Sequence, residues 1–269
     1  ISRARIFSKY KDLLIKNMDT LAEMVSSQHG KTIPDAKGSI QRGIEVVEYV
    51  IGITSSLKGE HSANVGTNVD SHTLRQPLGV CAGITPFNFP AMVPMWMFPV
   101  AIACGNTFIL KPSEKDPSCP LKLAELAIEA GFPAGVLNLV NGDKEAVDAL
   151  LENREVQAVS FVGSTPVAEY IYHTGTKNNK RIQALGGAKN HMVIMPDADV
   201  EKTTDAIIGS AFGSAGERCM AISVAVCVGK ETNEKIKNKL LEKTSKLNVG
   251  PYTDEKTDFG PLSSEAHYK

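Results

Sequence analysis

The sequence predicts an α/β protein built around a doubly wound parallel sheet. Four short apolar strands are expected at residues 80–84, 107–111, 136–140 and 156–162, and helical patterns lie between them, notably at 120–130 and 144–151. Regular alternation of strand and helix is typical of parallel sheets, which bind ligands at the carboxyl ends of their strands. The loops most relevant to function are therefore 85–90, 111–114 and 163–165.

The segments before the sheet predict two helices and a hairpin. Apolar residues from Ile6 to Met24 recur at helical spacing until Gly30 ends the pattern, and a second helix is expected from about 35 to 51. Gly, Asn, Ser and Thr then dominate residues 59–76, where alternating Val65 and Val69 indicate a hairpin that stands apart from the helices. The chain begins at Ile1, so any targeting segment would lie upstream.

Composition narrows the class of partner. The 269 residues are 42% hydrophobic, enough for about two domains, and 29 basic residues against 30 acidic ones leave no excess charge for nucleic acid or an anionic membrane. The longest apolar stretch, 89–104, contains three prolines and is shorter than the roughly 18 residues of a membrane-spanning helix. We therefore expect a small-molecule partner, with no nucleic acid and no membrane.

The cysteines indicate one reactive thiol. The five cysteines include no CxxC pair and no metal-site spacing with the six histidines, so we expect a reducing compartment, no disulfide and no metal. Cys81 and Cys227 lie in predicted strands, Cys104 ends a helix, and Cys119 is expected in a loop between prolines. Cys219 differs because it follows a glycine-rich turn and comes directly after a basic residue, and a positive neighbour favours the nucleophilic thiolate. A tightly packed helix-to-strand junction would contain the same small residues.

Two strand ends carry candidate cofactor groups. Gly163 and Ser164 follow the fourth strand and precede a helix that begins near Pro166, whose free N–H groups suit a pyrophosphate. The spacing is not G-x-G-x-x-G, and a plain helix cap would look the same. Lys111 and Glu114 end the second strand and are suited to gripping ribose hydroxyls, although a solvated charge pair is the alternative. A carboxylate there favours NAD over NADP.

Five segments together resemble the aldehyde dehydrogenase superfamily in order and spacing, over essentially the whole chain. They are Gly83 to Pro90, Leu110 to Glu114, Ser160 to Thr165, Leu185 to Asn190 and Gly216 to Cys219. Members have three parts and are longer, so the resemblance implies a fragment of a three-part fold. It implies a Rossmann-like NAD-binding domain at 1–58 and 77–184, an oligomerisation hairpin at 59–76, and the first part of a second α/β catalytic domain at 185–269.

The resemblance also implies a mechanism and a cofactor site. Cys219 would attack an aldehyde, the Asn88 amide and the Cys219 N–H would bind the oxyanion, and hydride transfer to NAD would leave a thioacyl-enzyme. Between two prolines, Asn88 could equally be a turn-forming residue. The residues implied to bind NAD are Thr85, Phe87, Lys111, Glu114, Lys115, Gly163, Ser164 and Gly186.

The acyl acceptor and substrate follow from three further positions. Hydrolytic members place a glutamate immediately before Leu-Gly-Gly, but this chain has Ala184 there, so coenzyme A is the expected acyl acceptor. Glu217 is an alternative base. The resemblance is strongest to a CoA-acylating branch that acts on methylmalonate and malonate semialdehydes, which implies that Arg218 and Arg42 bind the substrate carboxylate. Either arginine could equally form a structural ion pair.

Three functions remain open from the sequence. They are a CoA-acylating semialdehyde dehydrogenase, a hydrolytic NAD-dependent one that uses another base, and a non-enzymatic nucleotide-binding relative or inactive fragment. We expect a homo-oligomer, dimer or tetramer, located in the cytoplasm of a bacterium or in the mitochondrial matrix of a eukaryote.

Overall fold

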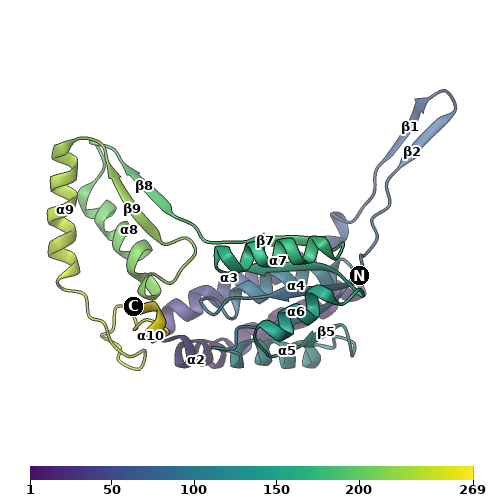
Figure 1. Cartoon of the computed structure of the whole chain (residues 1–269), viewed down its shortest axis with the longest axis horizontal. Coiled ribbons are helices and arrows are strands. Elements are labelled where there is room, and N and C mark those ends of the chain that lie inside the picture. The colour runs from purple at the N-terminus through teal and green to yellow at the C-terminus, as the bar shows by residue number, and fades with distance from the viewer. Residues whose placement is uncertain (269) are drawn as a thin grey trace. The chain divides into compact units, whose positions relative to one another are not determined.

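The computed structural model describes residues 1–268 and divides into two compact units, whose elements are labelled in Figure 1. Unit 1 contains Ile1–Leu21 and Ser39–Gly186. Unit 2 contains Ala22–Gly38 and the chain from Gly187 onward.

Unit 1 is built on a five-stranded parallel sheet of order β5-β4-β3-β6-β7, which confirms the predicted fold class. The strands are β3 Val80–Ile84, β4 Thr107–Lys111, β5 Leu137–Leu139, β6 Val156–Val162 and β7 Arg181–Leu185. The first four match the predicted strands. The sequence did not predict β7, because its residues alternate between exposed and half-buried and form no apolar run. The chain winds outward from β3 to β5 and then crosses back to β6 and β7.

Helices on the sheet complete the core of unit 1. They are α1 Ser2–Lys16, α4 Met92–Ala103, α5 Ser118–Ala130, α6 Lys144–Glu152 and α7 Thr165–Lys177. Buried side chains of β3, β6, α6 and α7 form one apolar cluster that includes Leu151, Phe161 and Ile171. The expected loop at Cys119 was wrong: this residue lies in the first turn of α5 and is fully buried. Pro120 is compatible with that position because the first helical turn needs no N–H from it.

The N-terminal helical pattern is broken where one helix was expected. Helix α1 ends at Lys16 and α2 Met18–His29 follows, with the Asn17 side-chain amide donating to the carbonyl of Leu13 at 2.8 Å. Helix α3 Ile33–Ile51 agrees with the prediction and buries Ile40 and its neighbours along the apolar stripe. The boundary between the units falls inside α2 and α3. The expected domains placed all of residues 1–58 in one domain, whereas residues 22–38 belong to unit 2. In this segment, Asp35 contacts Ser214 and Arg218 of unit 2.

A hairpin extends from unit 1 in the expected region. Strands β1 His61–Gly66 and β2 Val69–His72 pair antiparallel, and all their residues are exposed. The short helix η1 Ile53–Ser55 precedes them. Figure 1 shows the hairpin standing clear of the sheet and helices of unit 1. Its backbone edges are thus available for pairing.

Unit 2 holds a smaller α/β layer. Strands β8 Asn190–Ile194 and β9 Ile222–Cys227 pair in parallel. Helices α8 Val200–Phe212 and α9 Lys230–Thr244 accompany them. The buried cluster of this unit consists of Ile194 of β8, Ile207 of α8 and Ile236 of α9. Short helices η2 Gly213–Gly216 and α10 Glu265–Tyr268 follow α8 and α9 respectively. Within residues 1–268, no helix is long and apolar enough to cross a membrane.

Candidate active site

The carboxyl ends of four neighbouring strands form one edge of the sheet in unit 1. Ile84 at the end of β3 pairs with both Lys111 of β4 and Phe161 of β6, and Val162 pairs with Leu185 of β7. The winding of the chain reverses between β3 and β6, which is where doubly wound sheets bind ligands. The residues predicted to bind the cofactor follow these strand ends: Thr85, Phe87, Lys111, Glu114, Lys115, Gly163, Ser164 and Gly186.

Beyond the end of β4, a buried cation meets an exposed carboxylate. Lys111 Nζ lies 3.2 Å from Glu114 Oε2, with side chains 5% and 56% exposed. Burial raises the pKa of Glu114, but hydrogen bonds to its carboxylate from its own backbone and from Lys111 outweigh that effect, so the pKa is below its ordinary value. Lys115 Nζ lies 4.6 Å from the centre of the Phe87 ring. The carboxylate is thus ionised, oriented and accessible to a hydroxyl donor.

Two glycines near the start of α7 allow neighbouring side chains to pack closely against the backbone. A Cβ on Gly163 would lie 2.4 Å from the Phe161 ring, and one on Gly186 would lie 3.1 Å from Thr165 Oγ1. Ser164 occupies the N-cap position but makes no side-chain capping bond within the described chain. The first N–H groups of α7 are therefore placed to receive an anion.

The loop after β3 carries two buried polar groups. Thr85 Oγ1 has no hydrogen-bond partner among residues 1–268, although the residue is only 4% exposed. Asn88 lies between β3 and α4, and its side-chain carbonyl oxygen is also buried. A buried hydroxyl without a partner costs free energy, which fits a residue that meets a ligand.

Cys219 is an exposed cysteine of unit 2 that follows an unusual turn, with Glu217 and Arg218 between them. Ser214, Ala215 and Gly216 have φ values of +53°, +53° and +77°, so three residues in succession adopt the left-handed conformation. The side-chain amide of Asn190 donates to the Cys219 carbonyl at 2.9 Å. The nucleophile candidate is therefore an exposed residue that is held by its backbone.

The Glu217 side chain contacts residues near the C-terminal end of the described chain. Its carboxylate accepts from the N–H and Oγ of Ser263, at 3.3 and 3.0 Å, and lies 2.6 Å from His267 Nδ1. His29 Nε2 is 3.7 Å from the other oxygen. Burial, and then the charge of Lys31, lower the pKa of His29 to about 3, so this imidazole is neutral at pH 7. The Glu217 carboxylate is thus engaged by Ser263 and His267.

The two predicted arginines have different surroundings. Arg218 Nη2 lies 2.8 Å from Asp35 Oδ2, and its side chain is 24% exposed. Arg42 lies in unit 1 on α3, where its side chain is 72% exposed and only 3.5 Å from Glu45. Cys219 and Arg218 thus belong to unit 2, while Arg42, Asn88 and the predicted cofactor residues belong to unit 1.

Sequence reasoning missed three residues that support the conformation of residues 214–219, which we call the nucleophile loop after the candidate nucleophile Cys219. Asp35 binds the loop through Ser214 and Arg218, and Asn190 binds it at the carbonyl of Cys219. Asn190 is part of a family motif, but neither Asp35 nor Ser214 has a sequence signal beyond a carboxylate early in a helix and a serine in a turn. Their role depends on contacts between distant segments.

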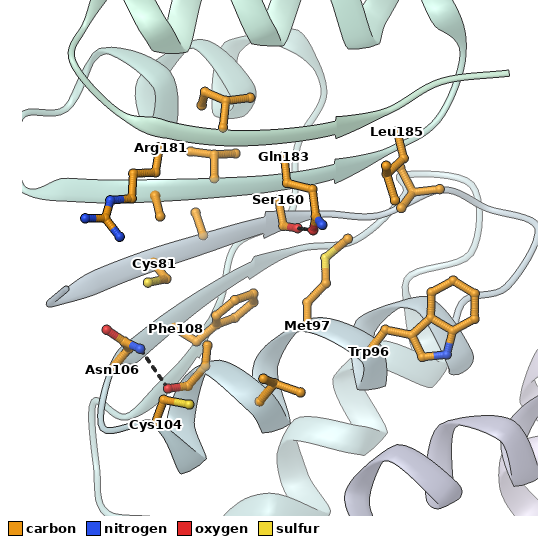
Figure 2. Close-up of a pocket in the computed structure, with 17 residues that line it drawn as sticks. Cys81, Trp96, Met97, Cys104, Asn106, Phe108, Ser160, Arg181, Gln183 and Leu185 are labelled. Atoms are coloured by element: carbon orange, nitrogen blue, oxygen red, sulfur yellow. Dashed lines mark hydrogen bonds between the residues drawn. The ribbon is translucent and has the colours of Figure 1, made fainter. Parts of the chain in front are cut away.

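Unit 1 also contains an apolar pocket of about 460 Å³ that the sequence did not predict. Figure 2 shows it between α4, which contributes Trp96 and Met97, and β7, which contributes Gln183 and Leu185. The Ser160 hydroxyl donates to Gln183 Oε1 at 2.8 Å on its wall. None of the predicted site residues lines this pocket, so the strand ends and Cys219 remain the candidate site.

The fold and the motifs on it are those of one enzyme family: the chain belongs to the aldehyde dehydrogenase family, whose model matches residues 1–269. It is 58% identical to malonate-semialdehyde dehydrogenase of Pseudomonas aeruginosa over 264 residues, which cover 98% of this chain and 53% of that protein.

Solved structures of similar proteins match the chain over nearly its whole length. The structure of methylmalonate-semialdehyde dehydrogenase from Oceanimonas doudoroffii matches with a TM-score of 0.97 and 57% identity, over 99% of this chain and 55% of that one. A structure from Sinorhizobium meliloti complexed with NAD, assigned to methylmalonate-semialdehyde dehydrogenase, matches with a TM-score of 0.96 and 60% identity, over 98% and 54%. The chain therefore spans about half the length of these relatives.

Proposed function

We propose that the protein oxidises methylmalonate semialdehyde and malonate semialdehyde with NAD and coenzyme A, through a thioacyl intermediate on Cys219. The observation that carries the proposal is the exposed Cys219 thiol directly after Arg218, in a loop held by Asn190 and Asp35. Identities of 57–58% to proteins named for these two semialdehydes support the substrate class.

NAD fits the strand ends of unit 1. The ionised Glu114 suits a ribose 2′-OH and would repel a 2′-phosphate, the first turn of α7 suits the pyrophosphate, and Thr85 offers a buried hydroxyl without a partner within residues 1–268. When bound at these strand ends, NAD would supply the hydride acceptor. Lys111 orients Glu114 through the 3.2 Å ion pair.

The chemistry at Cys219 needs an oxyanion site. The thiolate sulfur bonds to the aldehyde carbon, and the carbonyl electrons move to oxygen, where the Asn88 amide and the Cys219 N–H are proposed to donate. Loss of the hydride restores the carbonyl as a thioester. Removing one such donor typically costs roughly 3 kcal/mol of transition-state stabilisation.

Coenzyme A is proposed as the acyl acceptor because water lacks an evident activator. Ala184 lies on β7, and its methyl side chain packs against the apolar cluster of unit 1. Glu217 already accepts hydrogen bonds from Ser263. The CoA sulfur would form the new thioester bond as the Cys219 sulfur leaves. A thioester carbonyl β to the carboxylate accepts the electron pair of the breaking C–C bond, so CO2 is released and an enolate remains. This enolate takes up a proton at carbon, which gives propionyl-CoA or acetyl-CoA.

The substrate carboxylate is proposed to pair with Arg218. Asp35 contacts Nη2 of its guanidinium, and the carbonyl of Gly209 accepts from Nη1 at 3.3 Å. Each terminal nitrogen carries two hydrogens, so donors remain for a carboxylate. Arg42 is the alternative partner, contributed by unit 1.

The exposed hairpin of unit 1 is proposed to join copies of the chain into a dimer or tetramer. Its residues are exposed throughout, and Val65 and Val69 present apolar surface. The bacterial relatives favour a cytoplasmic location.

The deciding experiment is mass spectrometry of the acyl product formed from methylmalonate semialdehyde and NAD, with and without CoA. We expect propionyl-CoA with CoA and little turnover without it, and no product from Cys219→Ser. Free acid as the sole product, formed at equal rates with and without CoA, would favour the hydrolytic alternative. An absence of NADH under every condition would favour the nucleotide-binding alternative.

A further inference from the structure

One carboxylate oxygen holds the nucleophile loop at two points. Asp35 Oδ2 accepts a hydrogen bond from Ser214 Oγ at 2.5 Å and lies 2.8 Å from Arg218 Nη2. Ser214 begins the left-handed turn, and Arg218 is the residue before Cys219. The two contacts therefore bracket the turn and end beside the thiol.

The turn needs such a support. In the left-handed conformation the Cβ of an L-residue crowds the backbone, and Ser214 and Ala215 both carry a Cβ at φ +53°. A backbone hydrogen bond from the N–H of Glu217 to the carbonyl of Ser214, at 2.9 Å, closes the turn itself. Strained conformations persist where surrounding contacts hold them, and they cluster at functional sites.

The chain also makes room for the ion pair. A Cβ on Gly213 would lie 2.6 Å from Arg218 Nη1, so the guanidinium rests against the Gly213 backbone. Gly213 has φ −53° and ψ 137°, which any residue can adopt. An alanine at this position would therefore have to displace the guanidinium, whereas the backbone itself would not be strained.

Asp35 is well placed to remain charged. It lies in the first turn of α3, where the helix dipole favours an anion. Burial raises the pKa of Asp35, but the Ser214 hydrogen bond and the charges of Lys31 and Arg218 outweigh it and hold the pKa below its ordinary value. The carboxylate therefore keeps both contacts at neutral pH.

We propose that Asp35 is a positioning residue for Cys219, which it fixes through Ser214 and Arg218 without touching the substrate. The inference rests on the proposed role of Cys219 as nucleophile. Residues 22–38 would then serve the nucleophile loop of unit 2, although most of the N-terminal segment belongs to unit 1.

Hydrogen–deuterium exchange of the full protein tests the positioning without requiring activity. In Asp35→Asn, we expect peptides covering 213–220 to exchange roughly tenfold faster, with peptides of α9 unchanged. Gly213→Ala keeps Asp35 but displaces the guanidinium, so it should give the same local loosening. Because both changes weaken the ion pair between Asp35 and Arg218, their effects on exchange should be less than additive in the double variant. Asp258→Asn is the matched control, since this carboxylate of unit 2 binds the N–H of Asn248.

Kinetics then separate positioning from general stability. At a temperature well below unfolding, kcat for propionaldehyde should fall roughly tenfold in both variants because the thiol is misplaced, while the KM for NAD stays unchanged. Unchanged exchange at 213–220 in both variants would overturn the proposal, and so would normal kcat in both. If the wild-type protein forms no NADH, the proposed function fails, but the exchange data still decide whether Asp35 holds the loop.

Discussion

The side-chain amide of Asn190 binds the backbone around Cys219, the candidate nucleophile, donating to the carbonyl of Cys219 at 2.9 Å and to that of Ala221 at 3.0 Å. Asn190 begins β8 and pairs with Ile222, the first residue of β9. The amide therefore fixes the end of the nucleophile loop to the small sheet of unit 2.

Asn190→Ala should weaken both stability and catalysis. Two hydrogen bonds are lost, so the free energy of unfolding in urea should fall by about 1–3 kcal/mol. Looser backbone at Cys219 should lower kcat roughly tenfold. Asn138→Ala is the control, because its amide donates to Gly135 in an exposed turn of unit 1. If the two variants behave alike, Asn190 has no special role at the thiol.

Cys219 should be the fastest cysteine to react with iodoacetamide. It is exposed, whereas burial raises the pKa of the Cys81 thiol, and burial together with Asp116 raises that of Cys119. Peptide mass spectrometry should show at least roughly tenfold faster labelling of Cys219. Cys219→Ser should abolish NADH formation, while Cys104→Ser should retain it. Equal labelling of all five thiols would contradict this assignment.

The pair at the end of β4 should control cofactor binding. Lys111→Met keeps the apolar stem of the side chain but no longer orients Glu114, so the NAD dissociation constant measured by calorimetry should rise roughly tenfold. Glu114→Gln should narrow the preference for NAD over NADP because the 2′-phosphate is no longer repelled. Glu125→Gln disrupts a surface pair of the same spacing, with Lys122, and should change neither. NAD affinity unaffected by both site variants would remove them from the cofactor site.

Arg218→Leu should lower kcat/KM for two aldehydes to different extents. Losing a charged, desolvated hydrogen-bonded pair costs about 2–5 kcal/mol, so kcat/KM should fall at least roughly tenfold further for methylmalonate semialdehyde than for propionaldehyde, which has no carboxylate. Steady-state kinetics with both substrates measure this difference. A matched loss for both would assign Arg218 to thiol activation and loop geometry, leaving Arg42 as the carboxylate partner.

His29 should make unit 2 less stable in acid. Its folded-state pKa of about 3 is far below the ordinary 6.5, so the unfolded chain takes up the proton first as the pH falls. Stability from this group is complete above about 6.5 and declines by up to about 1.4 kcal/mol per pH unit toward pH 3. Urea unfolding between pH 4.5 and 6.5 should show a shallower decline for His29→Gln. His173→Gln, at an exposed position on α7, should keep the wild-type slope.

Local sequence patterns determine much of the fold. Apolar strands alternate with segments whose apolar residues recur at helical spacing, and this pattern predicts the sheet from β3 to β6. The pattern arises because burying one face of a helix requires apolar residues at regular positions along the sequence. The motif residues at strand ends are also predictable, since parallel strands bring their carboxyl ends to one edge. Where burial is weak, as in the alternating strand β7, the same reasoning fails.

Tertiary structure alone decided how the nucleophile is held. Asp35 and Ser214 lie 179 positions apart in the chain, and no periodicity links a helix N-terminus to a distant turn. The left-handed conformation of Ala215 is likewise opposed by its own sterics and arises from the contacts around it. Residue types and their spacing are thus sufficient to propose Cys219 as the reactive thiol. Its support from Asp35 and Asn190 depends on long-range contacts that form only when the segments fold together.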